Sequence, residues 1–375
     1  MKKNLMRIHQ RGMSLVEILV AVAIGLIGIL IITQAYITSD NFNRTTLGEG
    51  GAQTNGTIAL FTLERELRQA GYGIASSAAL GCGAINYYRN GQYSGNLGGP
   101  LPNIQLAPVV ITTTPGVPDQ ITVMYSTASE AIVPTTLSKS MPNASAELSV
   151  DGTAGFQVGN MVLMVNKTPP QTCTMLEITS VSVPASNIQH NPGAGGVYNP
   201  PGAGLFPAYQ KDDMVFNLGN PRVRTYSIGN NSLRLFDMLF NSAAPVTFDM
   251  VDGIVDLRAH YGKDNGVNNN TVTNAVYAAD DGIVDSYSSV TPVNAAEWAQ
   301  VHSVRIAVLA RIGTYERPTG GACTATTVTP TWSGSTNLLA TPLSPFVLPE
   351  GLPSCYRYRM FETVIPLRNM IWRPA

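Results

Sequence analysis

The chain contains 375 residues, with 23 basic and 24 acidic side chains and a formal net charge of −1. Charged residues make up only 13% of it, so the composition excludes a global electrostatic field of the kind that attracts nucleic acid. The 35 glycines and 25 prolines favour a β-rich, loop-rich body over a helical bundle.

The N-terminal segment consists of a short basic leader and an apolar run. The leader ends at Gly12, and its cations are Lys2, Lys3, Arg7 and Arg11. About 20 predominantly apolar residues follow, from Met13 to Ile32, and as a helix they span about 30 Å, enough to cross the hydrocarbon core of a membrane. Because the cations precede this run, we expect the N-terminus in the cytoplasm and residues 38–375 outside.

Glu17 is the only charged residue of the apolar run. A carboxylate in such a span costs about 2.5–3.5 kcal/mol, less near the interface, unless it finds a cation. Cleavage after Gly12 would free an amino group on Met13, one helical turn away. In a staggered filament, that amine can face Glu17 of a neighbouring subunit. The alternative is that Glu17 lies at the membrane boundary and is only solvated.

The stretch Arg11-Gly12-Met13-Ser14-Leu15-Val16-Glu17 resembles the class III signal of type IV pilins and type II secretion pseudopilins. The resemblance implies that a prepilin peptidase cuts after Gly12 and methylates the amino group of Met13. It also implies that Glu17 is the fifth residue of the mature chain. Met13 stands where this family usually has Phe.

Residues 38–73 are predicted to continue the helix beyond the membrane. Glu64 and Arg68 form an i, i+4 pair on its polar side, and the glycines at positions 71 and 73 end it. The Gly-rich stretch 48–51 has poor helix propensity, so we expect either a kinked or melted segment or a helix–loop–helix connection there. Apolar residues recur on one helical face: Leu60, Leu63, Leu67 and Ala70.

Short alternating apolar runs predict strands in the rest of the chain. They lie at residues 120–125, 161–165, 214–217, 222–228, 232–236, 254–258, 302–312 and 356–367. The sequence Gly229-Asn230-Asn231 between two of these runs indicates a hairpin. Segments 185–210, 262–300 and 317–345 are rich in turn-forming residues and are predicted as long loops.

The four cysteines all lie in the part predicted to be exported, where an even number indicates two disulfides. They are Cys82, Cys173, Cys323 and Cys355. None forms a CxxC pair, so a zinc site is not indicated. Three pairings are possible, of which sequence proximity favours Cys323–Cys355 with Cys82–Cys173.

The C-terminal half carries a second resemblance. The order IVDLRAHYG, DDGIVDSY, EWAQVHSVRIAVLAR and YRYRMFETVIPLRN is similar to the PilW family of minor pilins. It implies an α+β fold, in which a long N-terminal transmembrane and amphipathic helix packs on an antiparallel β-rich, pilin-like head. The expected organisation is a leader at 1–12, a transmembrane part at 13–37, a periplasmic helical part at 38–73 and a head at 74–375.

An Asp-rich loop is the candidate metal site. Asp280, Asp281 and Asp285 flank Gly282, and calcium takes about six to eight oxygen ligands of the kind that such loops supply. The alternative is a solvated turn, since the spacing is not that of an EF-hand. The chain is predicted not to be an enzyme, because its four His are scattered and it contains no nucleophile elbow or P-loop. No cofactor other than a possible calcium ion is expected.

The two resemblances imply a minor pilin, a structural subunit that helps to initiate type IV pilus assembly, near the pilus tip. The implied partners are other minor pilins, the major pilin, prepilin peptidase and inner-membrane lipid. The implied location is the inner membrane, with the head in the periplasm, and then the cell-surface pilus. Alternatives are a minor pseudopilin of type II secretion and a tip adhesin or DNA-uptake module. Residues 356–359 alternate Tyr and Arg, which fits a strand better than a DNA-binding patch, so no nucleic-acid partner is expected.

Overall fold

The structure is a computed structural model. It describes residues 13–80, 82–130, 133–143, 147–168, 171–191, 197–201, 204–239, 247–266, 281–316, 322–336, 344–349, 351 and 353–371. The predicted site residues Gly12 and Asp280 lie outside these ranges. The chain divides into two units, residues 1–51 and residues 52–375, and each is described by itself.

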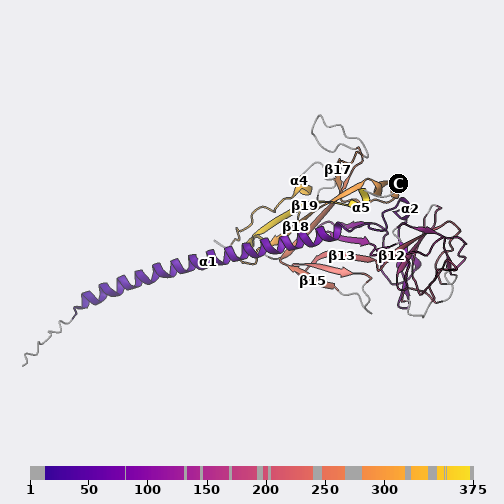
Figure 1. Cartoon of the computed structure of the whole chain (residues 1–375). Coiled ribbons are helices and arrows are strands. Elements are labelled where there is room, and N and C mark those ends of the chain that lie inside the picture. The colour runs from indigo at the N-terminus through magenta and orange to yellow at the C-terminus, as the bar shows by residue number, and fades with distance from the viewer. Residues whose placement is uncertain are drawn as a thin grey trace, which may run out of the picture. The chain divides into compact units, whose positions relative to one another are not determined.

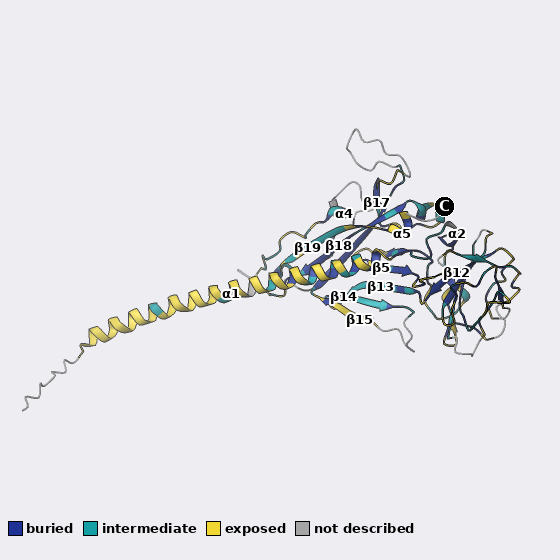
Figure 2. Ribbon diagram, in the orientation of Figure 1, coloured by how far each residue is buried: buried dark blue, intermediate teal, exposed yellow. Residues whose placement is uncertain are grey.

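Helix α1 (Leu15–Leu67) is continuous through both units. Its residues before Ala52 are almost all exposed (Figure 2). The melted segment or loop expected at residues 48–51 is therefore wrong. Three glycines in a helix cost about 3 kcal/mol, whereas restarting a helix carries a nucleation factor of about 10⁻³, or about 4 kcal/mol, so the uninterrupted helix is the more stable choice.

Two sheets enclose the last turns of α1. The first has the strand order β15-β14-β13-β5-β4, with β4 (Val109–Thr112), β5 (Gln120–Tyr125), β13 (Arg222–Gly229), β14 (Ser232–Asp237) and β15 (Thr247–Asp252). The second has the order β17-β16-β18-β19, with β16 (Ile254–Lys263), β17 (Ser286–Ser288), β18 (Val301–Arg311) and β19 (Tyr358–Pro366). Both are antiparallel. In Figure 1 the final part of α1 runs between β18 and β19 on one side and β13 and β15 on the other.

The largest core cluster joins this helical end to both sheets. Of the predicted apolar face, Leu63, Leu67 and Ala70 are fully buried and Leu60 is half-buried; Ala59, which was not predicted, is also fully buried. They pack with residues of the first sheet such as Val123 and of the second such as Ile306. The predicted α+β fold, with a helix packed on an antiparallel β-rich head, is confirmed.

A second layer of sheets forms the far part of the head, around β12 in Figure 1. Its main sheet has the order β1-β9-β8-β12-β6, and β1 pairs with β9 in parallel. The strands are β1 (Ile85–Asn86), β6 (Thr135–Thr136), β8 (Met161–Val165), β9 (Cys173–Glu177) and β12 (Met214–Gly219). Beside it lie β7 (Leu148–Ser149), β10 (Ser180–Ser182) and β11 (Asn187–Gln189), and the hairpin of β2 (Tyr88–Arg89) and β3 (Gln92–Tyr93).

Every predicted strand is present, and several segments predicted as loops hold short elements. The predicted 185–210 loop contains β11, and the 262–300 loop contains β17 and α3 (Ala295–Ala299). The 317–345 loop contains α4 (Ser333–Thr336). The remaining short helices are α2 (Ser77–Leu80), α5 (Arg368–Ile371), η1 (Gly95–Leu97) and η2 (Pro353–Cys355). These elements are too short for a periodic pattern to show in the sequence.

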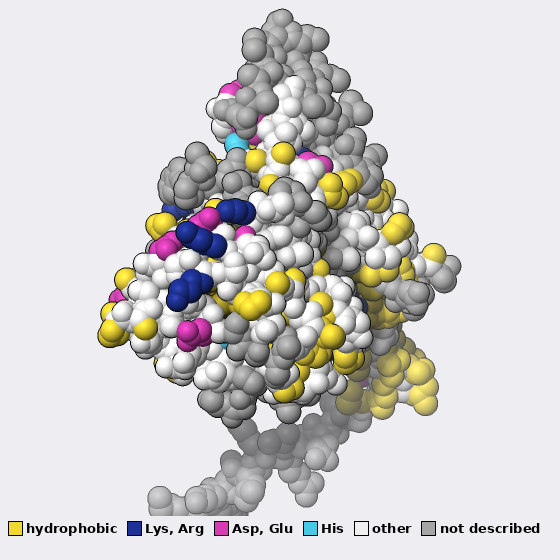
Figure 3. Space-filling model, turned by 90° about the vertical axis from the view of Figure 1, so that its right-hand side faces the viewer, with side chains coloured by type: hydrophobic (Ala, Val, Ile, Leu, Met, Phe, Trp, Pro, Cys, Tyr) yellow, Lys and Arg dark blue, Asp and Glu magenta, His cyan; other side chains and the backbone are white. Residues whose placement is uncertain are grey.

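The face of the head shown in Figure 3 is mostly uncharged. On the face in Figure 3, Lys and Arg side chains lie next to Asp and Glu side chains, and neither sign dominates. Lys167 pairs with Asp212 at 3.2 Å, and Arg234 pairs with Asp249 at 2.7 Å. This agrees with the low fraction of charged residues in the sequence.

Candidate functional site

The start of α1 carries a reciprocal pair of hydrogen bonds. The Glu17 amide donates to Ser14 Oγ (3.2 Å), and the Ser14 amide donates to Glu17 Oε2 (3.3 Å). This is a capping box, which satisfies two amides that a helix leaves without internal partners. It was not predicted, although the S-x-x-E spacing in the sequence signals it. Among the described residues nothing bonds the other carboxylate oxygen of Glu17, Oε1.

The residues after this cap form an exposed apolar helix. Leu15–Asp40 is long enough and apolar enough to cross a membrane, and none of its most apolar stretch is buried in the structure. Met13, directly before the helix, is also exposed. A soluble protein rarely leaves so large an apolar surface in water, so this segment needs lipid or protein neighbours.

A buried ion network fastens the other end of α1 to the head. Glu66 is 2% exposed, and its Oε1 accepts a hydrogen bond from the Arg224 guanidinium of β13 at 2.9 Å. Arg224 also donates to Asp237 of β14 (3.1 Å), and the Tyr125 hydroxyl donates to Glu66 Oε2 (3.1 Å). Burial raises the pKa of the Tyr125 phenol to about 12. The predicted pair of Glu64 and Arg68 is present on the exposed side.

A close contact accompanies this network. Gly56 lies against the ring of Phe361 on β19, and a Cβ at this position would fall 2.1–2.7 Å from three ring carbons. Glycine therefore lets the helix approach the second sheet. After the helix end, the side-chain NH₂ group of Asn369 in α5 donates to the backbone carbonyls of Gln69 (3.3 Å) and Ala70 (3.0 Å). These bonds cap the chain as it leaves α1.

Both disulfides are present. The structure joins Cys82 to Cys173 and Cys323 to Cys355, the pairing that sequence proximity favoured. The first bond ties the segment before β1 to β9, and the second ties residue 323 to the turn before β19. No described cysteine is free.

The described carboxylates of the Asp-rich loop bond backbone amides. Asp285 Oδ2 accepts from the amides of Asn265 (2.8 Å) and Gly266 (2.6 Å), and Asp264 Oδ2 accepts from Gly282 (2.7 Å). Asp281 Oδ1 accepts from Ile283 (2.8 Å). Asp264 and Asp285 thus cross-link the two chain segments at the base of the loop. The described residues contain no group of three or more His, Cys, Asp or Glu side chains placed to hold a metal ion.

A row of buried polar groups lies on the outer face of β16. Arg258 donates to Asp256 Oδ2 (3.2 Å) and to Asp119 Oδ1 (3.3 Å), and burial raises the pKa of both carboxyls to about 6. Asp119 also accepts the Ala259 amide (3.0 Å), which links the β4–β5 connection to the edge of β16. The row therefore acts as a cross-brace between the two sheets.

His260 continues the same row. Its ring packs against Trp332 at 4.8 Å between centroids, and its two ring nitrogens have no hydrogen-bond partner among the described residues. Burial, with Arg305 and Arg258 nearby, lowers its pKa to about 4. The imidazole is neutral and enclosed, and no described nucleophile bonds it, so it has the character of a structural residue.

The Tyr and Arg side chains of residues 356–358 have partners within the head. The Arg311 guanidinium lies over the Tyr356 ring (4.6 Å to its centroid), and Arg357 pairs with Glu316. The Tyr358 hydroxyl donates to the Pro353 carbonyl (3.1 Å). These side chains are thus occupied by contacts within the head.

Segments in both halves of the chain match known protein families. Residues 7–33 match the prokaryotic N-terminal methylation motif, and residues 223–369 match the type IV pilus-assembly protein W family, PilW. Among solved structures, the chain is similar to the type IV-like pilin TTHA1219 from Thermus thermophilus. That similarity has 10% sequence identity and a TM-score of 0.31, and it covers 85% of this chain and 97% of the other. No curated protein matches the chain.

Proposed function

The chain is a PilW-type pilin with a prepilin N-terminal signal, and on that basis we propose that it is a minor pilin that primes assembly of a type IV pilus near the tip. The observation that carries the proposal is the exposed apolar segment Leu15–Asp40, which overlaps the methylation motif at residues 7–33 and belongs to a helix whose last turns pack in a folded head. Such a subunit needs neighbours along its helix, and a filament of related helices supplies them.

The proposal fixes a sequence of events for the N-terminus. A prepilin peptidase removes residues 1–12 after Gly12 and methylates Met13, while residues 13–37 hold the subunit in the inner membrane. Residues 38–73 and the head at 74–375 lie on the periplasmic side. The subunit then joins other minor pilins and the major pilin in the growing filament.

Glu17 has two roles in this proposal. Its Oε2 caps the helix of its own subunit through Ser14, as in the free chain. Its Oε1 accepts the methylated amine of Met13 of a neighbouring subunit, which removes the cost of a carboxylate without a cation in an apolar setting. The Ser14 hydroxyl serves only the cap, so mutation of Ser14 changes the capping without removing the carboxylate of the proposed intersubunit contact.

The test compares Glu17→Ala with Ser14→Ala in cells that assemble the pilus. Ser14→Ala removes the side-chain half of the cap, worth about 1 kcal/mol, but keeps the carboxylate. We expect Glu17→Ala to insert into the membrane normally and to lose co-purification with partner pilins and piliation, while Ser14→Ala keeps both. Normal piliation with Glu17→Ala, or an equal defect in both variants, would contradict the intersubunit role.

A further inference from the structure

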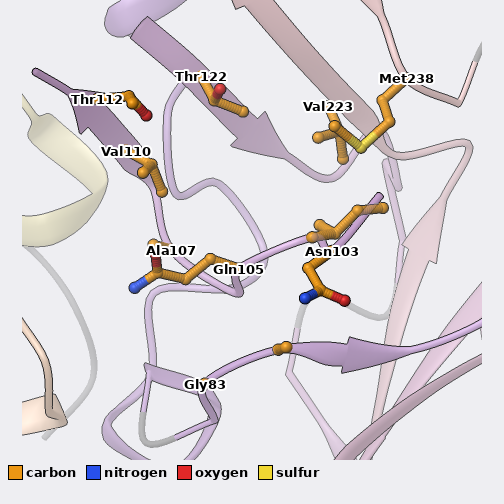
Figure 4. Close-up of a pocket in the computed structure, with 11 residues that line it drawn as sticks. Gly83, Asn103, Gln105, Ala107, Val110, Thr112, Thr122, Val223 and Met238 are labelled. Atoms are coloured by element: carbon orange, nitrogen blue, oxygen red, sulfur yellow. The ribbon is translucent and has the colours of Figure 1, made fainter. Parts of the chain in front are cut away.

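A cavity of about 360 Å³ lies in the head, away from α1. Its floor is the outer face of the first sheet, with Val110 and Thr112 of β4, Thr122 of β5 and Val223 of β13. Its opposite wall is formed by residues 83–84, 103–105 and 107 (Figure 4). The volume falls in the range of ligand pockets, which is about 300–1,000 Å³.

The wall opposite the sheet is held in place by the fold. Cys82, next to Gly83, is bonded to Cys173 of β9. Leu106 donates to the carbonyl of Gly83 (3.1 Å), and Ile85 donates to that of Ile104 (2.8 Å). A Cβ added at Gly83 would meet no atom within 4 Å. The cavity is therefore preformed, and Gly83 leaves space at its edge.

The lining excludes whole classes of ligand. Its described residues include no ionisable side chain, so they would desolvate a charged ligand without compensation. They also include no aromatic ring, which a ligand that binds by stacking would need. What it offers is apolar surface from Val110 and the adaptable Met238, beside uncharged hydrogen-bonding groups.

Those hydrogen-bonding groups match a peptide backbone. The Gln105 side chain and the Thr112 hydroxyl form no hydrogen bond with the described residues, and a carboxamide both donates and accepts, as a peptide group does. Asn103 uses its Oδ1 for the Asn96 amide (2.7 Å), which leaves its NH₂ as a donor. Amides beside apolar surface suit an extended segment with small apolar side chains.

We propose that this cavity binds a short, uncharged, extended peptide segment. The backbone of the segment is bonded by Gln105 and Asn103, and its small apolar side chains lie against Val110 and Met238. The proposal does not depend on the role in pilus assembly, since it concerns a site that neither α1 nor its anchor contributes to.

The test uses the full-length protein in detergent micelles and an array of capped hexapeptides built from Gly, Ala, Val, Ser and Thr. A matched array carries one central Lys or Glu. Peptides retained on the array are then titrated in solution by fluorescence polarisation. We expect uncharged peptides to bind and a single charge to weaken binding tenfold or more.

Two variants test the location of binding. Gly83→Leu adds an apolar side chain at the edge of the cavity, and Thr112→Lys places a charge at its exposed rim; each is expected to weaken binding at least tenfold with an unchanged melting temperature. Gly313→Leu is the matched control, because Gly313 also has open space around it and lies outside the lining. The proposal is overturned if no uncharged peptide binds, if a charged peptide binds equally well, if a neutral oligosaccharide displaces the peptide, or if Gly83→Leu and Thr112→Lys bind like the control.

Discussion

Leu19 and Leu63 lie on the same helix, but Leu19 is 60% exposed and Leu63 is fully buried. Before residue 52 the apolar side chains of α1 face outward on every side of the helix. After it, Ala59, Leu63 and Leu67 form a buried stripe that packs between two sheets, and the opposite side, which still includes the exposed Ile58 and Phe61, is mostly polar. A helix that is apolar all round is made for lipid or for other helices, whereas a striped helix is made for a core in its own chain.

The two ends of α1 are therefore stabilised by different partners. Residues 52–67 obtain theirs when the head folds. The exposed part obtains its partners only from a membrane or a filament, neither of which belongs to the chain. Mutations in the two parts should therefore change different measurements, and four predictions test this separation.

Processing of the leader is the largest expected effect, because it is all or none. The mature protein should begin at Met13 with a methylated amine, since the methylation motif covers residues 7–33. Gly12→Leu should leave the leader attached, abolish assembly into pili, and leave the head folded with an unchanged melting temperature. Intact mass of membrane-extracted protein decides the cleavage. A wild-type chain that retains residues 1–12 in cells with active peptidase would contradict the assignment.

Glu66→Ala should destabilise the head by about 3 kcal/mol, because it leaves Arg224 with one carboxylate partner in a mostly buried site. Glu64→Ala is the matched control on the same helix. Its partner Arg68 is about half exposed, and exposed pairs are worth less than about 1 kcal/mol. Chemical denaturation of both variants measures the difference. Equal losses would mean that the network does not fasten the helix.

The importance of Glu66 could not be predicted from the sequence. Glu66 reads as one more charged residue of the polar side, and its partner Arg224 is 158 positions away. Local patterns did predict α1, the helix-ending glycines and the β13–β14 hairpin, where Asn230 and Asn231 have φ of 54° and 57° as the turn requires. They failed for β1 and β9, whose pairing is parallel and long-range.

The same limit applies to the candidate site. The motif at residues 11–17 named Met13 and Glu17 because that signal is local in the chain. The peptide-binding cavity was not predicted, since its walls come from residues 83–107 and from strands as late as β13. The Asp-rich loop was noticed, but the hydrogen bond from the Gly282 amide to Asp264 Oδ2 joins residues 18 positions apart, which no local pattern shows.

The head should gain more stability on acidification when His260 is replaced. The pKa of His260 in the folded state is lowered to about 4. Its contribution to the free energy of unfolding is therefore complete above pH 6.5 and is lost as the pH falls toward 4, with about 2 kcal/mol lost by pH 5. Asp119 and Asp256 act in the opposite direction. Their pKa values, raised to about 6, make folding more favourable as the pH falls from about 6 toward 4.

In wild-type protein these contributions oppose each other. His260→Gln removes the first and leaves the second, so the variant should gain stability between pH 7 and pH 5 relative to wild type. Denaturation midpoints at the two pH values measure this. The groups that face His260 are Arg258 on its own strand, the uncharged Trp332, and Arg305 on β18, which pairs with Glu362 of β19 at 3.6 Å. Parallel pH profiles would contradict the assignment.

The smallest expected changes in stability come from replacing two glycines of α1 that lie on either side of residue 52. A methyl group added at Gly50 would meet no atom within 4 Å, so Gly50→Ala should stabilise the helix locally by about 0.5–1 kcal/mol, seen as a two- to five-fold slowing of amide exchange nearby. Gly56→Ala drives a methyl group into the Phe361 ring and should destabilise the head by about 1 kcal/mol. In a Phe361→Leu background that penalty should shrink, because the obstructing ring is gone. If Gly50→Ala and Gly56→Ala change stability in the same direction, the two parts of α1 are not stabilised differently.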